Sequence, residues 1–213
     1  MRVTKYGHCC LLVEIDGLRV LTDPGIWSRN FADLTNIDVV LITHEHQDHL
    51  HVESVQAILK NNPSAEIITN GSVGKILEEH SIVHTVLEGR DTANRAEVAI
   101  EAFDGPHATI FEKFGLVQNT GYFIANQFFY PGDAYIEPNM TVAVLALPVA
   151  GPWCKAEDAL NYAIAVKPNK AFPVHDAVLG ENGINLVHGL FENVLKTKGV
   201  IFESLKEGES KEF

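Results

Sequence analysis

One short segment constrains the fold of this chain more than any other. Residues 38–43, Asp-Val-Val-Leu-Ile-Thr, form a nearly continuous apolar run, which predicts a strand buried on both faces. The six residues that follow, His44-Glu-His-Gln-Asp-His49, hold three imidazoles and the carboxylate of Asp48 close together. These histidines repel one another when protonated, and a bound cation removes that conflict because it favours neutral imidazole and ionised carboxylate. The pattern therefore predicts a strand that delivers metal ligands to the edge of a sheet.

Further ligands must come from other parts of the chain. His44 and His46 alternate along an extended segment and point the same way, so they can hold one ion. Asp48 and His49 come after the chain turns into the next helix and can face a second ion. Three more candidates each stand just beyond the C-terminal end of a predicted strand, beside Gly or Pro residues: His107, Asp133 and His175.

Seven nitrogen and oxygen ligands are too many for one tetrahedral ion and suit two. One arrangement gives each metal three ligands and shares the seventh: His44, His46 and His107 on the first, Asp48, His49 and His175 on the second, and Asp133 between them. Each metal then keeps room for a shared water. The set contains no thiolate, which argues against a closed structural zinc site and favours an open, reactive one.

The other patterns alternate between strands and helices. We expect a hairpin of strands 10–15 and 18–21 around Asp16-Gly17, and later strands at 38–43, 66–69, 97–103, 120–125, 128–130, 141–148, 170–174 and 200–203. Helices are expected at 52–59, 73–79, 156–166 and 185–198, and residues 206–213 read as a solvated or frayed end. This order predicts an α/β protein in which two sheets pack face to face with helices outside.

Composition limits the class of protein. The chain has 213 residues, no repeat and no linker, so we expect a single domain over 1–213. Lys and Arg total 16 against 28 Asp and Glu, and the net charge of −12 argues against nucleic acid as a partner. Three cysteines imply no disulfide framework, and we expect them to be buried small residues. With no long apolar run, we expect a cytoplasmic protein away from membranes; homo-oligomer formation is left open.

The order of motifs also resembles a known family. Thr43-His-Glu-His-Gln-Asp-His49, then a lone His107, then Gly132-Asp133 and finally Pro173-Val-His175 is similar to the motif order of the metallo-β-lactamase-fold superfamily. The opening at residues 3–8 and the segment Thr22-Asp-Pro24 resemble its small single-domain metal-dependent hydrolases, related to L-ascorbate-6-phosphate lactonase. Asp133 stands where zinc β-lactamases commonly have a cysteine, so lactam antibiotics are not expected substrates. The loop 108–119 also differs from what that group leads us to expect.

The resemblance implies a four-layer αββα sandwich, with two mixed β-sheets, helices on the outer faces and a dinuclear site at one edge. It carries ligand roles onto the seven residues as paired above. Three further residues are weaker candidates for supporting the ligands or lining the pocket: Asp23, His8 and Trp153. The remaining histidines are expected at the surface or at helix ends: His51, His80, His84 and His188.

These features predict a metal-dependent hydrolase. Two divalent ions, zinc first and manganese or iron as alternatives, would share a hydroxide that attacks a small ester, lactone or phosphodiester, with an anionic substrate expected. Asp48 would hold the nucleophile as well as bind metal. Two alternatives belong to other classes: an iron-dependent oxidoreductase on the same fold, because the ligands also suit iron, and a non-catalytic scaffold that binds metal for stability.

Overall fold

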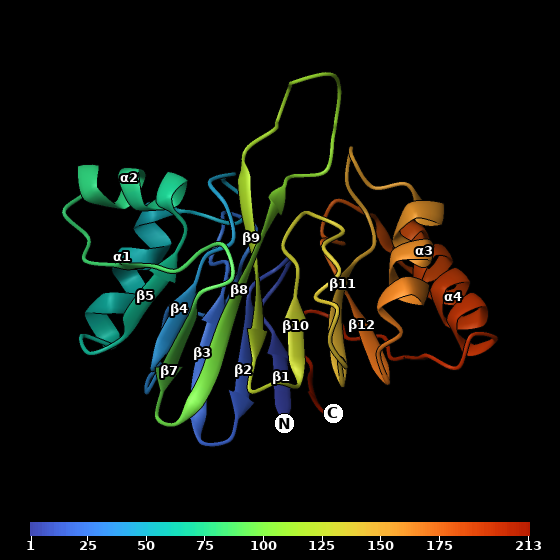
Figure 1. Ribbon diagram of the computed structural model, residues 1–213, viewed down its shortest axis with the longest axis horizontal. Helices are drawn as coiled ribbons and strands as arrows, with labels where there is room; N and C mark the ends of the chain where they lie inside the picture. Colours follow the sequence, from blue (N-terminus) through green and yellow to red (C-terminus); the bar gives the residue numbers. More distant parts are fainter.

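The computed structural model describes residues 1–213 and shows a four-layer αββα sandwich (Figure 1). Two mixed β-sheets of seven strands each pack face to face. Helices α1 and α2 cover the outer face of one sheet, and α3 and α4 cover the outer face of the other (Figure 1). The predicted fold class is therefore confirmed.

The first sheet has the strand order β14-β1-β2-β3-β4-β5-β6. Its strands are β1 (Arg2–Lys5), β2 (Leu11–Ile15), β3 (Leu18–Thr22), β4 (Val39–Leu41), β5 (Glu66–Thr69), β6 (Thr85–Val86) and β14 (Ser210–Glu212). Pairing is antiparallel from β14 to β3 and parallel from β3 to β6. The helices α1 (Val52–Asn61) and α2 (Gly71–Glu79) form two of the crossovers that parallel strands require.

The second sheet repeats this plan, with the strand order β13-β12-β11-β10-β9-β8-β7. Its strands are β7 (Thr92–Arg95), β8 (Val98–Pro106), β9 (Gln118–Ile124), β10 (Phe128–Tyr130), β11 (Val144–Pro148), β12 (Lys170–Val174) and β13 (Ile201–Phe202). Pairing is antiparallel from β7 to β10 and parallel from β10 to β13. The crossover helices here are α3 (Ala156–Val166) and α4 (Glu181–Lys196).

Alternation along the strands divides the buried side chains into three layers. Leu41 of β4 points between the sheets, whereas its neighbour Val40 packs in the layer beneath α1 and α2. Phe128 of β10 likewise lies between the sheets and Phe129 in the layer beneath α3 and α4. Successive strand residues face opposite sides, so a strand covered on both sides is apolar throughout. That is the physical reason for the apolar runs in the sequence.

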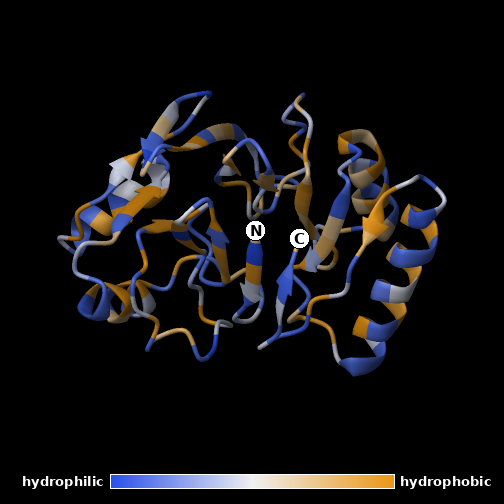
Figure 2. Ribbon diagram, turned by 90° about the horizontal axis from the view of Figure 1, so that it is seen from below, coloured by the Kyte–Doolittle hydropathy of each residue, from blue (hydrophilic) through white to orange (hydrophobic).

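The prediction of a frayed end is wrong for the last residues, although Ser210 and Glu212 are exposed to solvent. Strand β14 pairs antiparallel with β1, and the amide of Phe213 donates to the carbonyl of Met1 at 2.9 Å. The two ends of the chain therefore lie side by side (Figure 2). Ser-Lys-Glu has no hydrophobic pattern that would mark a strand. It is extended because it satisfies the backbone groups along the edge of β1.

Two helices also begin earlier than predicted: α2 at Gly71 rather than 73 and α4 at Glu181 rather than 185. The start of α2 is set by Asn70, whose side chain accepts a hydrogen bond from the amide of Val73 at 3.1 Å.

None of the helices combines the length and the hydrophobicity that a membrane crossing requires.

Candidate metal centre

Four strands end at one edge of the sandwich, and a predicted ligand follows each of them. His44 comes after β4, His107 after β8, Asp133 after β10 and His175 after β12. Backbone hydrogen bonds join the two sheets here, because the amide of Thr120 donates to the carbonyl of Thr43 at 3.0 Å. Side chains that lie far apart in the sequence are thus brought to one place.

The candidate ligands form two groups of four, and Cys9, His49 and Asp133 form a third set of possible ligands. Within each group, the ligand atoms all lie within 4.8 Å of one another. The first group contains His44, His46, His107 and Asp133, and the second contains His8, Asp48, His49 and His175. The structure therefore brings the seven predicted residues together at one edge and places His8 with Asp48, His49 and His175.

Asp133 lies between the two groups. Its Oδ2 atom is 3.3 Å from Nε2 of His107 in the first group and 2.8 Å from Nε2 of His175 in the second. Its Oδ1 atom is 3.2 Å from Nε2 of His49. The indole N–H of Trp153 donates to Oδ2 at 3.1 Å, so Trp153 fixes this carboxylate. The carboxylate of Asp133 therefore lies within reach of histidines of both groups.

Many polar atoms at this edge are buried without a hydrogen-bond partner. Nε2 lacks a partner in four of the predicted ligands: His44, His49, His107 and His175. Nδ1 of His175, Oδ1 of Asp133 and both ring nitrogens of His8 also lack a partner. Leaving one such group unpaired in the interior costs about 1–3 kcal/mol. Nitrogen and carboxylate oxygen are the donors that zinc and related divalent ions bind. The residues present therefore fit a metal.

The other ring nitrogen of three of these histidines is held by the protein. Nδ1 of His44 lies 3.0 Å from the hydroxyl of Thr43, and Nδ1 of His107 lies 2.6 Å from the carbonyl of Ala108. Nδ1 of His49 lies 2.7 Å from Oδ2 of Asp23. Such contacts fix the ring and its tautomer, so that Nε2 is left for a metal.

Asp23 supports this edge from directly behind it. Its carboxylate accepts hydrogen bonds from the amide and hydroxyl of Thr43, at 2.8 and 2.7 Å, and from the hydroxyl of Tyr130. Asp23 is fully buried and has a φ of +35°, a left-handed conformation that Asp tolerates better than most residues. The structure thus places Asp23 against a ligand imidazole and not in the open site.

Electrostatics give His44, His8 and Asp133 the protonation states that metal binding needs, whereas Asp133 and Asp23 outweigh burial and raise the pKa of His49 well above its ordinary value. Burial lowers the pKa of His44 well below its ordinary value, and burial also lowers the pKa of His8 to about 4. Burial alone would raise the pKa of Asp133, but His175 and His49 outweigh it and hold that pKa well below the ordinary range. Neutral imidazole beside ionised carboxylate is the state that a divalent cation binds.

The open side of the centre is formed by His46 and Asp48, which are only partly buried. The loop between β8 and β9 rises beside them (Figure 1). A side chain at Gly115 in this loop would come within 3.9 Å of the ring of His46. Two aromatic side chains of the loop, Phe111 and Phe114, are mostly exposed. The loop therefore borders the approach to the ligands.

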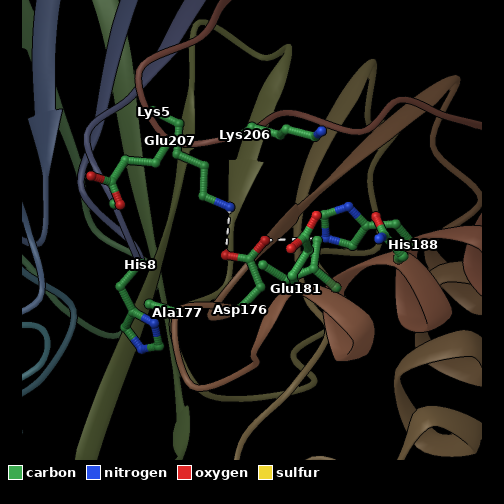
Figure 3. Close-up of a pocket in the computed structure, with 11 residues that line it drawn as sticks. Lys5, His8, Asp176, Ala177, Glu181, His188, Lys206 and Glu207 are labelled. Carbon is green, nitrogen blue, oxygen red and sulfur yellow. Dashed lines mark hydrogen bonds and ion pairs between the residues drawn. The ribbon is translucent and has the colours of Figure 1, made fainter.

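A cavity of about 340 Å³ lies behind His8 (Figure 3). Lys5 is buried against it and forms an ion pair with Asp176 at 2.6 Å. His188 also lines this cavity and is buried, with its ring nitrogens 2.9 Å from Ser204 and 3.1 Å from Asp176. The prediction that His188 lies at the surface is wrong, because α4 turns this residue toward the charged group of Asp176.

The other predicted surface histidines lie at or near helix ends. His51 caps the start of α1, His80 ends α2, and His84 is partly buried against Gly74. Of the three cysteines, Cys9 and Cys10 are buried as predicted, and Cys154 is half-buried.

Comparison with known proteins gives a consistent picture. Residues 2–175 match the family model described as the beta-lactamase superfamily domain. Protein Rv0786c of Mycobacterium tuberculosis is 34% identical over 203 residues, covering 92% of this chain and 94% of its own length. A UPF0173 metal-dependent hydrolase of Archaeoglobus fulgidus is 27% identical, covering 100% of this chain and 99% of its own length. The structure of Igni18, a metallo hydrolase from Ignicoccus hospitalis, superposes with a TM-score of 0.76 at 19% identity, covering 100% of this chain and 98% of that chain.

Proposed function

The chain belongs to the beta-lactamase superfamily, and from that membership and the geometry of its sheet edge we propose that it is a metal-dependent hydrolase of small molecules. One observation carries the proposal: buried imidazole nitrogens without hydrogen-bond partners converge on Asp133 and Asp48. The names of two similar proteins, a metal-dependent hydrolase and a metallo hydrolase, support it.

Two divalent cations would be held at this edge. The first would be bound by His44, His46 and His107 and the second by Asp48, His49 and His175, with Asp133 beside both. Bound there, such cations lower the pKa of water toward neutrality and polarise the bond to be cleaved. Zinc suits this set of donors best, and manganese and iron bind the same atoms.

Asp48 is the carboxylate of the centre that reaches solvent, with 19% of its side chain exposed against 2% for Asp133. Burial raises the pKa of Asp48, but the contact with His8 and the nearby His49 and His175 outweigh it, so the net direction is downward. An ionised carboxylate at this position accepts a hydrogen bond from an attacking water and orients it toward the substrate. We assign this role to Asp48.

The cysteines are not suited to act as the nucleophile in hydrolysis. Cys9 and Cys10 are buried, and burial raises the pKa of each thiol above its ordinary value. Burial raises the pKa of Cys154 to about 11. Because the thiolate is the reactive form, these side chains are poor nucleophiles at neutral pH. Water is therefore the nucleophile that we propose.

The substrate class that we propose is a small ester, lactone or phosphodiester, with an anionic group. A protein of net charge −12 repels anions on average. Attraction for such a substrate must then come from the bound cations. Trp153, which packs against His107 and His175, would form an apolar wall beside it.

The test combines metal content with hydrolysis. Protein purified without chelator or nickel is analysed by mass spectrometry and assayed on p-nitrophenyl esters, lactones and bis-p-nitrophenyl phosphate. We expect activity that is lost on metal removal and restored by zinc or manganese. Bound iron together with oxygen consumption would favour the oxidoreductase alternative, and activity that survives complete removal of metal would contradict the proposal.

A variant tests the role of Asp48. Asp48→Asn should lower kcat at least about 100-fold, because general-base catalysis contributes that much or more, and should leave the unfolding temperature of the metal-free protein close to that of the metal-free wild type. Asp33→Asn, at an exposed position in a loop, is the matched control and should have full activity. Wild-type turnover in Asp48→Asn would refute the role that we assign to this residue.

A further inference from the structure

We propose that His8 is an additional ligand of the second cation, so that this cation is bound by His8, Asp48, His49 and His175. The inference rests on the proposed function only in that this edge binds metal. His8 lies between β1 and β2, ahead of the other ligands in the sequence, and its ring lies beside that of His175 with centroids 4.0 Å apart. Three observations support the assignment.

The first observation is the position of the ring. His8 is fully buried, and its Nε2 lies within 4.8 Å of ligand atoms of Asp48, His49 and His175. Nε2 of His8 is 3.2 Å from Oδ2 of Asp48, yet neither ring nitrogen forms a hydrogen bond. A buried ring nitrogen therefore lies close to a carboxylate oxygen without a hydrogen bond between them. A cation between them would satisfy both.

The second observation is how firmly the ring is positioned. Gly7 has a φ of +113°, and any side chain there would lie 2.5 Å from the carbonyl oxygen of Trp27. The rings of Trp27 and His8 meet edge to face with centroids 4.8 Å apart. The carbonyl of His8 accepts a hydrogen bond from the amide of His175 at 3.1 Å. The local structure thus fixes a side chain that makes no hydrogen bond of its own.

The third observation is the contrast with His188, a second buried histidine that lines the same cavity (Figure 3). Both ring nitrogens of His188 have partners, Ser204 and Asp176. Nε2 of His8 lacks a partner, as does Nε2 of His44, His49, His107 and His175. His8 therefore shares the signature of the predicted ligands and differs from a structural histidine.

Metal affinity in variants tests the assignment. Wild type, His8→Ala and His8→Gln are dialysed and analysed for metal by mass spectrometry, and zinc and manganese dissociation constants are measured by chelator competition. We expect each His8 variant to bind one of the cations at least about tenfold more weakly, with the other unchanged. Asp48→Asn should weaken binding of the same cation. His188→Gln is the matched control and should retain wild-type affinity for both.

The outcomes separate this inference from the proposed function. If the wild-type protein binds no metal on titration, this result contradicts the proposed function. Unchanged metal content and affinity in both His8 variants would overturn the role of His8 alone. If the variants fail to fold, the inference can be tested in the wild-type protein by nuclear magnetic resonance. In protein labelled with ¹⁵N-histidine, zinc should shift the Nε2 resonance of His8. No shift at saturating zinc, while other ligand histidines respond, would also overturn the inference.

Discussion

At the scale of single residues, Asp23 shows how one buried carboxylate can position several groups. It holds the backbone and hydroxyl of Thr43, the ring of His49 and the hydroxyl of Tyr130. Thr43 in turn contacts the ring of His44. One side chain therefore orients ligands of both groups, His49 directly and His44 through Thr43.

We predict that Asp23→Asn weakens metal binding about 10- to 100-fold, the usual effect of losing a group that orients ligands. The amide must turn an N–H group toward at least one of these donors, so we also expect a loss of about 1–3 kcal/mol in the free energy of unfolding. Chelator competition and urea unfolding measure the two effects. Tyr130→Phe removes one donor and leaves His49 in place, so its effect on metal affinity should be smaller. Equal affinity in Asp23→Asn and wild type would contradict this account.

The seven candidate residues could be expected to meet because four are closely spaced after one strand and each of the other three follows a strand end. The network of Lys5, Asp176 and His188 could not be predicted in the same way. Nζ of Lys5 donates to the carbonyl of Pro173 at 2.9 Å and to Asp176, and these residues are far apart in the chain. A lysine in a strand gives no local sign that it is buried. Only the packing of the two sheets provides the carboxylate that pairs with it.

At the scale of elements, strands were predictable where a covered face leaves a side-chain pattern. The apolar strand β4 and the strand β12 follow this rule, and β12 matches its predicted bounds, residues 170–174. Strands β1, β6, β7 and β14 were missed: β1 has a single apolar residue, and the other three have mostly polar or partly exposed side chains. Each is extended because a neighbouring strand offers free backbone groups, which the sequence of the short segment does not reveal.

Ion pairs of Glu203 connect β12 to β14, which belong to different sheets. Its carboxylate lies 3.0 Å from Nζ of Lys170 and 2.9 Å from Nζ of Lys211. The hydrogen bond from Lys211, with that from Lys170, outweighs burial and lowers the pKa of Glu203 below its ordinary value. A carboxyl whose pKa is lower in the folded state stabilises the protein above its unfolded pKa, and this contribution is lost as the pH falls through the folded value.

We therefore predict that Glu203→Gln lowers the free energy of unfolding by about 0.5 kcal/mol at pH 7, since the pair is partly exposed to solvent. The difference from wild type should shrink as the pH falls from about 4.5 through the lower folded pKa. Urea unfolding at several pH values measures it. Glu79→Gln, at an exposed helix end without an ion pair, is the control. A difference that grows on acidification would contradict the assignment.

At the scale of the whole molecule, the centre depends on both sheets. The candidate ligands between His8 and His49 lie in the connections between strands of the first sheet. They meet candidate ligands that follow β8, β10 and β12 of the second sheet. The buried, unpartnered atoms at this edge are costly in the absence of a cation. Metal binding and the packing of the two sheets should therefore stabilise each other.

We predict that zinc or manganese at about 100 times its dissociation constant raises the free energy of unfolding by about 2.7 kcal/mol. For a chain of this length, that corresponds to an increase of about 5–10 °C in the unfolding temperature. Calorimetry of metal-free protein with and without each ion measures the effect. Magnesium prefers oxygen ligands and should stabilise the protein much less. Equal stabilisation by magnesium would argue against a site rich in imidazole.

The spread of ligands along the chain has a consequence for biosynthesis. The first group is complete once Asp133 has left the ribosome, whereas the second also needs His175. Strand β11 and helix α3 must be made between these two points. In the proposed centre, synthesis of the donors for the first cation is therefore complete before synthesis of the donors for the second.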